Sequence, residues 1–333
     1  MTNKIPKVAV ITRTKDRAIL LERAIQSVHN QTMGDFIHVI YNDAGDPKVV
    51  NDLAEKYKDI TKGRIQVVHN DTPKGLVSAL NNAIKSTDST YIAIHDDDDS
   101  WDKDFLKKTS EYLEDTAAYG VITVVDIVEE RIEGEQVIEI KRGRGLEPVK
   151  GVVSILDQCI ANYASTNTFV YRRAVYDEIG YYDEELKVAE DWDFTLRFLL
   201  KHDIHSLITD DALAFYHHRA SSTGSELNSI FAENGVDFEH HIKRIANHHL
   251  RKELQNGKLG LGYLIALMRH NNETMMHQND MLNGRINESV KHELHYVADN
   301  IKGHVDESTH REAQIILDSA IRRKLAKAIK KHD

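Results

Sequence analysis

The chain is poor in the residues that staple small secreted proteins or build stiff linkers. Its 333 residues include one cysteine, Cys159, and four prolines. A single cysteine excludes an intrachain disulfide and is consistent with a reducing cytosol without requiring one. So few prolines argue against long proline-rich linkers.

Long apolar runs and early basic clusters are also missing. The longest apolar stretch, residues 121–128, contains Thr123 and Asp126 and is far too short to span a bilayer as a helix. Residues 1–6 carry no apolar signal core. The net charge is −10, and no basic cluster precedes the last turns of the chain, so we expect no nucleic-acid partner. We expect a cytoplasmic protein, with peripheral contact to the inner face of the membrane as an open alternative.

What the first hundred residues do contain is an alternation of apolar runs with segments of helical spacing. Buried strands are predicted at residues 8–11, 36–41, 65–69 and 91–94. Helical spacing lies between them, at residues 21–28 and 75–84. This alternation predicts parallel βαβ units around a twisted sheet. Ligands of such sheets bind beyond the carboxyl ends of the strands, which are followed here by residues 12–14, 42–43 and 95–99.

The pattern changes after residue 115. Residues 121–128 and 137–140, joined around Glu133 and Gly134, predict a hairpin. Further strands are predicted at residues 168–171 and 213–216, and a helix at 192–200. From about residue 227 onward the pattern is helical, with a break marked by Gly257, Gly260 and Gly262. We therefore expect an α/β domain at 1–225 and an all-helical region at 226–333.

The sharpest motif is a run of four carboxylates, Asp96 to Asp99, directly after the predicted strand at 91–94. Adjacent like charges repel and raise each other's pKa. A hard divalent cation would relieve that repulsion and use the oxygens as ligands. An EF-hand loop would need Gly at its sixth position and Glu at its twelfth. Counted from Asp96 these are Trp101 and Lys107, which excludes an EF-hand.

Two further motifs are weak when taken alone. Glu190 and Asp191 lie where a helix should begin, and acidic residues there are often caps or dipole partners. His217 and His218 follow a predicted strand, but a chain with 19 histidines contains such pairs by chance.

In combination these elements resemble the inverting family 2 glycosyltransferases, which have the GT-A fold, a Rossmann-like nucleotide-diphospho-sugar transferase domain. The resemblance spans roughly residues 7–222. The run at Asp96–Asp99 resembles the family's DxD motif, and residues 180–193 resemble its glycine–aromatic–Asp-Glu stretch leading to a Glu-Asp pair. The remaining matching segments are residues 12–14, 42–46 and 74–83. The order and spacing of these segments are specific, whereas any one segment is not.

The resemblance implies roles for individual residues. Asp191 would be the general base, and Asp98 would coordinate Mn²⁺ or Mg²⁺. His218 would be a further metal ligand or diphosphate contact, with His217 left open. The donor site would comprise Thr12, Arg13, Thr14, Asp43, Gly75, Asp96 and Asp97.

The chain departs from the family pattern in the nucleoside loop. Asn42 replaces the first of two adjacent Asp residues, and Ala44-Gly45 stands for Gly-Ser, so the choice of uridine stays open. His95 occupies a place that is usually apolar. Two interpretations are open: His95 supports the site as a polar group, or it only ends the strand.

The reaction implied is transfer of a hexosyl or N-acetylhexosaminyl group from a nucleotide-diphosphate donor, with a UDP-sugar as the expected donor, to an acceptor hydroxyl. The acceptor would be a saccharide or lipid-linked compound in cell-surface polysaccharide or glycoconjugate synthesis. The metal would stabilise the charge of the leaving diphosphate, and a carboxylate would remove the acceptor proton. One base and direct displacement invert the anomeric centre, unlike retaining glycosidases.

Two other functions use the same kind of sheet. A nucleotidyltransferase that makes sugar nucleotides is expected to carry a glycine-rich phosphate loop after the first strand, and residues 12–16 contain no glycine. A non-catalytic module that binds nucleotide sugars would not need carboxylates at both Asp98 and Asp191.

The C-terminal tail carries an apolar stripe beside basic residues between Arg311 and Lys331. An apolar stripe on a helix must be buried against something. The alternatives are packing on its own domain, self-association into a homo-oligomer, binding to an anionic membrane surface, and a disordered tail. We expect the helical region to direct assembly or location and to carry no chemistry.

Overall fold

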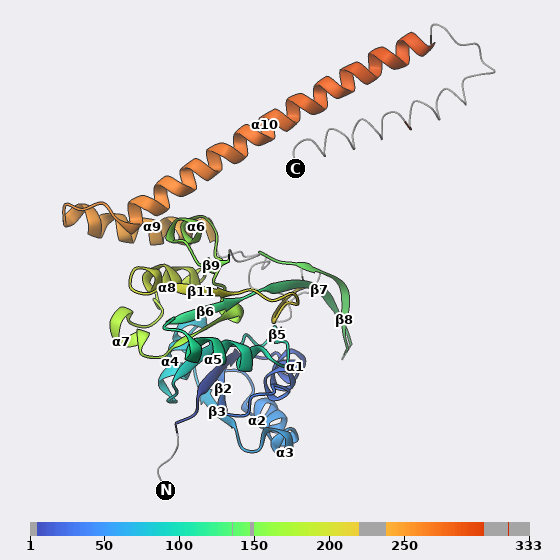
Figure 1. Ribbon diagram of the computed structural model, residues 1–333. Helices are drawn as coiled ribbons and strands as arrows, with labels where there is room; N and C mark the ends of the chain where they lie inside the picture. The colour runs from blue at the N-terminus through green and yellow to red at the C-terminus, as the bar shows by residue number, and fades with distance from the viewer. Residues whose placement is uncertain (1–4, 135, 147–149, 220–237, 303–318, 320–333) are drawn as a thin grey trace. The chain divides into compact units, whose positions relative to one another are not determined.

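The computed structural model describes residues 5–134, 136–146, 150–219, 238–302 and 319 (Figure 1). The chain divides into two compact units, Met1–Met268 and Arg269–Asp333. In chain order the elements are β1 (Val8–Thr14), α1 (Ala18–His29), β2 (Phe36–Asp43), α2 (Pro47–Lys56), α3 (Lys58–Thr61), β3 (Ile65–Asn70), α4 (Leu76–Lys85), β4 (Tyr91–Ile94), β5 (Ser100–Trp101), α5 (Phe105–Asp115), β6 (Gly120–Thr123), β7 (Val125–Glu133), β8 (Gln136–Arg144), β9 (Gly151–Val152), α6 (Ile155–Ile160), a 3₁₀ turn (Thr166–Thr168), β10 (Phe169–Arg172), α7 (Val175–Ile179), α8 (Glu190–Leu199), β11 (Ile204–Leu207), β12 (Ala214–His218), α9 (Phe238–Gln255) and α10 (Leu261–Lys302).

An eight-stranded sheet organises the first unit, in the order β3-β2-β1-β4-β10-β6-β11-β9. The predicted strands β1 to β4 run parallel. β10 is antiparallel to both of its neighbours, β4 and β6, so the sheet is mixed rather than fully parallel. The α/β fold expected from the alternation is therefore confirmed.

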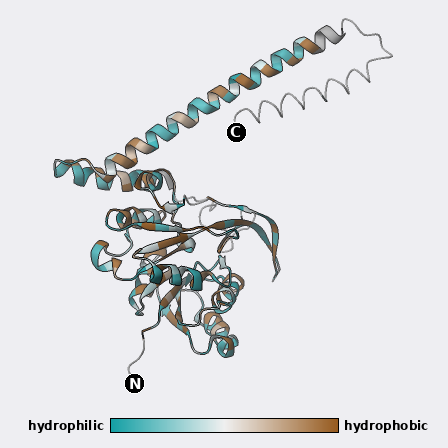
Figure 2. Ribbon diagram, in the orientation of Figure 1, coloured by the Kyte–Doolittle hydropathy of each residue, from teal (hydrophilic) through white to brown (hydrophobic). Residues whose placement is uncertain are grey.

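Successive residues of β1 face opposite sides of this sheet, as the two-residue period of a strand requires. Val8 and Val10 pack in one cluster with Leu106 of α5. Ala9 and Ile11 pack on the other face, in a cluster that includes residues of α4 and α8. Helices thus cover both faces, and apolar colouring concentrates on the strands between them (Figure 2). The carboxyl ends of β1, β2 and β4 are left free to form a site.

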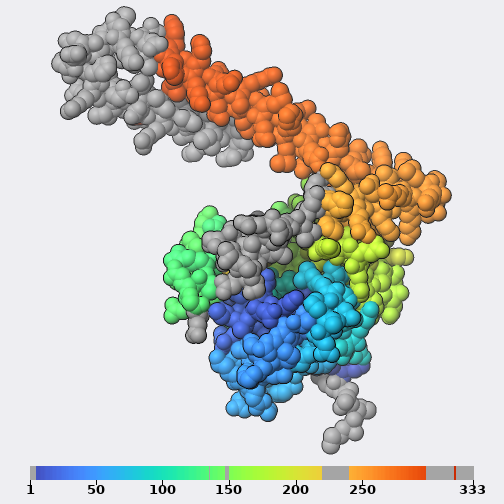
Figure 3. Space-filling model, turned by 180° about the vertical axis from the view of Figure 1, so that it is seen from behind, coloured from blue at the N-terminus to red at the C-terminus, as the bar shows by residue number. Residues whose placement is uncertain are grey.

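A second sheet has the order β5-β12-β7-β8. The apolar run 121–128, expected as one strand, divides at Val124 into β6 of the large sheet and β7 of the small one. The hairpin is formed by β7 and β8, which pair antiparallel as far as Glu133 and Gln136. From behind, this hairpin is the green ridge at the edge of the unit (Figure 3).

Two buried histidines lie between β2 and α1. His29 and His38 are 7% and 0% exposed, and their ring centroids are 5.4 Å apart. Both ring nitrogens of His29 and Nδ1 of His38 have no hydrogen-bond partner among the described residues. Burial lowers the pKa of His29 to about 4 and that of His38 well below its usual value.

We expect the free energy of unfolding to fall with acidification, and to fall less in a His29→Leu variant. The unfolded chain, in which the histidine pKa is 6.5, binds more protons than the folded chain between that pH and about 4. The contribution that His29 makes to the free energy of unfolding while it is neutral is therefore complete above pH 6.5, and it is lost as the pH falls toward 4. The slope is at most about 1.4 kcal/mol per pH unit. Urea denaturation at about pH 7 and about pH 5 compares the proteins; identical pH dependence would contradict the expectation.

Helices α9 and the start of α10 pack on the first unit. Ile242, Ile245 and Ile265 form one apolar cluster with Trp192 and Leu196 of α8. A Cβ on Gly262 would lie 2.1 Å from the backbone N of Leu250, so the two helices cross at a distance that only glycine permits. The expected break between these helices is confirmed. The first compact unit extends to Met268, and the functional division at residue 225 stays a prediction.

We expect a chain ending at Met268 to keep the cooperative unfolding of the full chain, and a chain ending at residue 225 to lose stability. The shorter chain lacks Ile242, Ile245, Leu261 and Ile265, which leaves Trp192 uncovered. Burial of one such side chain contributes about 1.5–3 kcal/mol. Thermal denaturation of the two truncated chains measures the difference. Equal melting temperatures would restore residue 225 as the boundary.

The described part of the second unit continues α10 from Arg269 to Lys302, with alternating polar and apolar bands (Figure 2). Within the described residues, no helix is long and apolar enough to cross a membrane. The tail stripe between Arg311 and Lys331 lies outside the described residues, except for Ser319.

Candidate functional site

A cavity of about 470 Å³ opens at the carboxyl edge of the large sheet. Its wall includes Arg13, Lys15, Arg17, Asp43, Asp96 and Asp98. Thr14, Gly75 and Asp97, also predicted from the sequence, line it as well. These residues follow or approach the ends of β1, β2 and β4, which are parallel neighbours and so end at one edge.

Arg13 ties the acidic loop to the start of α8. Its Nε and Nη2 donate to Asp96 Oδ1 at 3.1 and 2.9 Å, and its Nη1 donates to Glu190 Oε1 at 3.1 Å. Burial opposes the charged form, but the carboxylates of Asp96 and Glu190 raise the pKa of Arg13. Arg13 therefore both lines the cavity and holds two of its walls together.

Asp43 anchors the segment that precedes α4. Its two carboxylate oxygens accept from the backbone N–H of Lys74 at 2.9 Å and of Gly75 at 3.0 Å. Asn70 Nδ2 donates to Oδ1 at 3.1 Å. The side chain that the resemblance assigns to the nucleoside pocket thus also shapes that pocket's rim.

Asn42 closes the turn after β2 and is fully buried. Its Nδ2 donates to Gly45 O at 2.8 Å, and its Oδ1 accepts from Gly45 N at 3.0 Å. A Cβ on Gly45 would lie 2.7 Å from Asn42 Oδ1, so this turn requires glycine. An amide, which both donates and accepts, fits this place better than the family's usual carboxylate.

The carboxylates of the acidic loop have unequal surroundings. Burial raises the pKa of Asp97 to about 6 against the opposing charge of Arg17, whose Nη1 donates to Asp97 Oδ1 at 3.1 Å. Burial, with the charges of Asp98 and Asp96, raises the pKa of Asp99 well above its usual range. Asp99 Oδ1 accepts from the backbone N–H of His217 at 3.1 Å. The loop is thus held by cationic and backbone donors from several elements.

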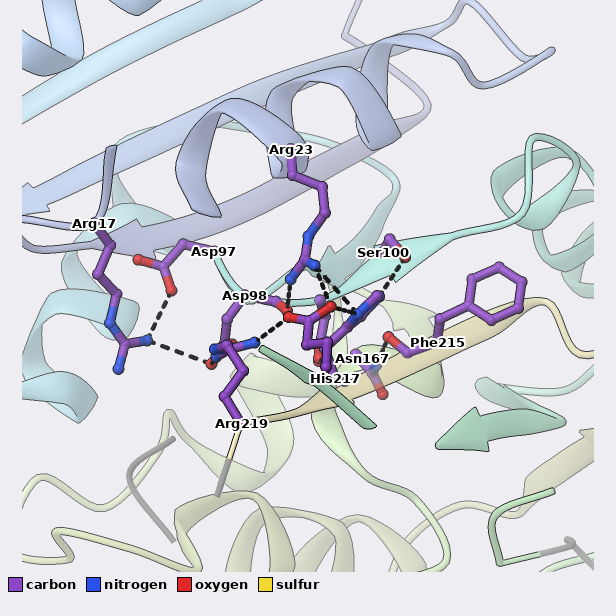
Figure 4. Close-up of polar contacts among 11 residues, drawn as sticks. Arg17, Arg23, Asp97, Asp98, Ser100, Asn167, Phe215, His217 and Arg219 are labelled. Atoms are coloured by element: carbon purple, nitrogen blue, oxygen red, sulfur yellow. Dashed lines mark hydrogen bonds and ion pairs between the residues drawn. The ribbon is translucent and has the colours of Figure 1, made fainter. Parts of the chain in front are cut away.

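Arginines from different elements converge on Asp98 (Figure 4). Arg219 Nη2 donates to Asp98 Oδ2 at 2.6 Å, and Arg17 Nη1 lies 3.4 Å from the same oxygen. Arg23, on α1, donates to the backbone carbonyl of Asp98. Arg219 is fully buried, so its charge depends on these carboxylate partners.

Glu130 completes the network behind the acidic loop. It accepts from Arg219 Nη1 and Arg23 Nη1, each at 2.7 Å, and from His217 Nδ1 at 2.5 Å. Burial opposes ionisation, but the His217 hydrogen bond and the Arg23 charge lower the pKa of Glu130 to about 2. Because Glu130 accepts from Nδ1, the Ser100 hydroxyl donates to Nε2 of His217 at 2.8 Å.

The pairing of β7 and β8 shifts register between Glu129 and Glu130, which marks a β-bulge. Successive residues of a strand face opposite sides of the sheet, and here Glu130 is 3% exposed while the Glu129 side chain is 52% exposed. The sequence pattern did not predict Glu130, Arg17 or Arg23 as site residues. Glu130 has no distinctive local signal because charged residues surround it in β7.

A second cavity, of about 270 Å³, shares Arg13, Leu76, Asp96 and Tyr216 with the first. Asp191 lies in its wall. The chain enters α8 through Ala189, whose φ of 60° is left-handed, and such strain in a non-glycine residue is common at functional sites.

Three donors hold the Asp191 carboxylate. Asn162 Nδ2 and Thr166 Oγ1 donate to Oδ2 at 2.8 and 3.2 Å, and the backbone N–H of Trp192 donates to Oδ1 at 2.8 Å. Burial raises the pKa of Asp191, and these hydrogen bonds oppose the rise. A partly buried, oriented carboxylate of this kind can accept a proton.

Four histidine and threonine positions singled out from the sequence lie outside the walls of these two cavities. Thr12 is fully buried, and its hydroxyl is 2.9 Å from His38 Nε2. His218 lines neither cavity in the described part of the chain, and its ring packs edge-on against Tyr216 at 4.5 Å. His217 belongs to the Glu130 network. His95 is a core residue that packs on Trp101, with Nε2 3.1 Å from Ser27 Oγ.

The side chains that could ligate a metal ion in this cavity suit a hard divalent cation only in part. Asp96 and Asp98 supply the carboxylate oxygens that Mn²⁺ and Mg²⁺ bind. Among the described residues, however, no group of three or more His, Cys, Asp or Glu side chains could hold a metal ion. A cation here would need further oxygen ligands, such as those of a bound diphosphate.

Known proteins share this arrangement of elements. Among solved structures, S. aureus TarS 1-349 has a TM-score of 0.56 at 21% identity, covering 80% of this chain and 71% of that one. The same fragment in complex with UDP-GlcNAc gives 0.52, covering 75% and 73%. The mannosyltransferase PcManGT from Pyrobaculum calidifontis, in complex with GDP-Man and Mn²⁺, gives 0.54 at 16% identity, covering 80% and 70%. These likenesses show the fold.

Sequence comparison identifies the family. The Bacillus subtilis (strain 168) protein named uncharacterized glycosyltransferase YwdF is 26% identical over 197 residues, which are 57% of this chain and 67% of that protein. The sequence profile described as Glycosyl transferase family 2 matches residues 9–180, more than half of the chain and including β1, β2, β4 and the acidic loop. With its mixed α/β sheet core like that of TarS and its C-terminal helices, the chain belongs to glycosyltransferase family 2.

Proposed function

We propose that this glycosyltransferase moves a sugar from a UDP-sugar to an acceptor hydroxyl with inversion of the anomeric centre. The observation that carries the proposal is the junction of the two cavities. One is lined by Arg13, Lys15 and Arg17, and the other contains the partly buried carboxylate of Asp191. The cations of the first cavity suit a diphosphate. An acceptor hydroxyl beside Asp191 in the second cavity would face that diphosphate.

In this proposal Asp191 is the general base. It takes the proton of the acceptor hydroxyl as the oxygen attacks the anomeric carbon, and the bond from that carbon to the diphosphate breaks. The leaving diphosphate gathers negative charge near Arg17 and Lys15. Fixed cations aimed at developing charge lower the barrier because they need no reorganisation during the reaction.

We propose Asp98 as the carboxylate that holds Mn²⁺ or Mg²⁺, with Asp96 and Asp97 in the donor site. A bound divalent ion would act there as a Lewis acid toward the diphosphate. The structure of PcManGT with GDP-Man and Mn²⁺ supports a metal, and that of TarS with UDP-GlcNAc supports a nucleotide-sugar donor. The contribution of His218 or His217 to the ion remains a prediction.

We expect an Asp98→Asn variant to lose Mn²⁺-dependent binding of UDP while it stays folded. The amide can still accept from Arg219, but it is a much weaker ligand for a hard cation than a carboxylate. Isothermal calorimetry with UDP, with and without Mn²⁺, measures the change, and an Asp71→Asn variant is the exposed control. Unchanged Mn²⁺-dependent affinity in Asp98→Asn would refute the metal assignment. GDP in place of UDP tests the choice of uridine.

The rival activities are less well supported. Residues 12–16 contain no glycine for a nucleotidyltransferase phosphate loop. Family membership favours sugar transfer over a module that only binds. We further propose hexosyl or N-acetylhexosaminyl transfer in polysaccharide or glycoconjugate synthesis. The second unit would serve in assembly or in membrane contact.

A further inference from the structure

The wall of the second cavity is rich in uncharged hydrogen-bonding groups and in carboxylates. Asn162, Ser165, Thr166 and Asn167 lie in it, together with Glu190 and Asp191. Asn162 and Thr166 each donate one hydrogen bond to Asp191 Oδ2. Asn162 Oδ1 also accepts from Gln158 Nε2 at 2.9 Å, and Asn167 Nδ2 donates to the Phe215 carbonyl at 3.3 Å. The hydrogen-bonding capacity left for a ligand is mainly that of the Ser165 and Thr166 hydroxyls, in the wall of a cavity of about 270 Å³. Hydroxyl groups, which both donate and accept, match such a surface.

The charges of the two cavities differ. Lys15 and Arg17 line the first cavity and do not line the second. The second has Arg13 as the sole cation among the described residues of its wall, and Arg13 is paired with both Asp96 and Glu190. Asp191 adds another carboxylate. The wall is therefore anionic even when Asp99, whose pKa is raised, is taken as neutral.

Two segments outside the described residues also lack basic side chains. Residues 220–237, which follow Arg219, contain no lysine or arginine but do contain Glu226, Glu233 and Asp237. Residues 147–149 likewise contain no lysine or arginine. A donor diphosphate bound with its divalent cation would be close to neutral, so it would not offset the negative charge of the shared wall. An anionic group entering the second cavity would meet repulsion from the carboxylates of that wall.

We propose that the second cavity binds the acceptor and selects an uncharged hydroxyl compound, a neutral sugar or polyol, over one with phosphate or carboxylate next to the reacting hydroxyl. The inference rests on the proposed function, since it takes Asp191 as the base. It adds the chemical class of the acceptor, with charge as the selecting property. The hydroxyl and amide side chains of residues 162–167 would contact the acceptor's neighbouring hydroxyl groups.

The test uses the full chain with UDP-GlcNAc and Mn²⁺, and glycerol and glycerol 3-phosphate at equal concentration as paired acceptors. Transfer product and hydrolysis are both quantified by mass spectrometry. We expect glycerol to capture the sugar at least about tenfold more often than glycerol 3-phosphate, since one close like-charge contact is worth that much or more. Equal or preferred transfer to glycerol 3-phosphate would overturn the inference and leave the proposed function standing. Hydrolysis without transfer to either alcohol would overturn the assignment of this cavity to the acceptor.

Absence of both hydrolysis and UDP-GlcNAc binding would instead count against the donor in the proposed function, and the inference would fall with it. A charge variant separates charge from shape. Ser165 lines the cavity and does not contact Asp191, and Ser165→Gln is the neutral control of comparable length for Ser165→Lys. We expect the lysine variant to raise relative transfer to glycerol 3-phosphate by about tenfold over the glutamine variant. Identical ratios in these two variants would show that charge does not select the acceptor.

Discussion

An Asp191→Asn variant should lose at least about 10²-fold in kcat while it binds UDP-sugar almost as tightly as the natural protein. General-base catalysis by a positioned side chain typically contributes 10²–10⁴-fold. The amide keeps the size of the carboxylate, and its oxygen can still accept from Asn162 and Thr166, so the wall of the second cavity should keep its shape. Steady-state transfer kinetics give kcat, and calorimetry gives the affinity for the donor.

A matched control is available on the same approach to α8. Asp183 is exposed, and its Oδ1 accepts only from the nearby backbone N–H of Glu185 at 3.0 Å. We expect Asp183→Asn to leave kcat unchanged. If Asp191→Asn keeps its kcat and loses donor affinity instead, Asp191 is a binding residue and the proposed mechanism is wrong.

The second large effect concerns stability. Glu130→Ala should lower the free energy of unfolding by about 3–5 kcal/mol, the usual result of removing one partner from a buried ion pair. The substitution removes one carboxylate partner of Arg219, which is fully buried and also donates to Asp98. It also removes the acceptor for His217 and for Arg23. Urea denaturation followed by circular dichroism measures the loss.

The neighbouring residue provides the comparison. The Glu129 side chain is 52% exposed, and it lies 3.6 Å from Lys141. Exposed pairs of this kind contribute about 0–1 kcal/mol, so Glu129→Ala should change stability little. If the two variants lose similar free energies of unfolding, the buried network around Glu130 contributes no more to stability than the exposed Glu129 pair does.

The alternation of strands and helices in the first hundred residues predicted β1 to β4 and the edge where their loops meet. The apolar run at 121–128 misled the same reasoning, because composition does not reveal that Val124 separates strands of two different sheets. The extension of the compact unit past residue 225 to Met268 has a related cause. α9 reads as a polar helix, and only its contacts with Trp192 and Leu196 show that it covers the first unit.

The sequence alone determined which chemical groups stand at the carboxyl edge of the sheet: the carboxylates of Asp96–Asp99 follow β4, and Asp43 ends β2. Periodicity and strand ends are local properties, so they can be read along the chain. Tertiary structure decided which cations neutralise those carboxylates. Arg219 reaches Asp98 from 121 residues away, and Arg13 reaches Glu190 from 177 residues away. No local pattern encodes such pairs, because burial selects them only once the sheet and its helices have excluded water from both partners.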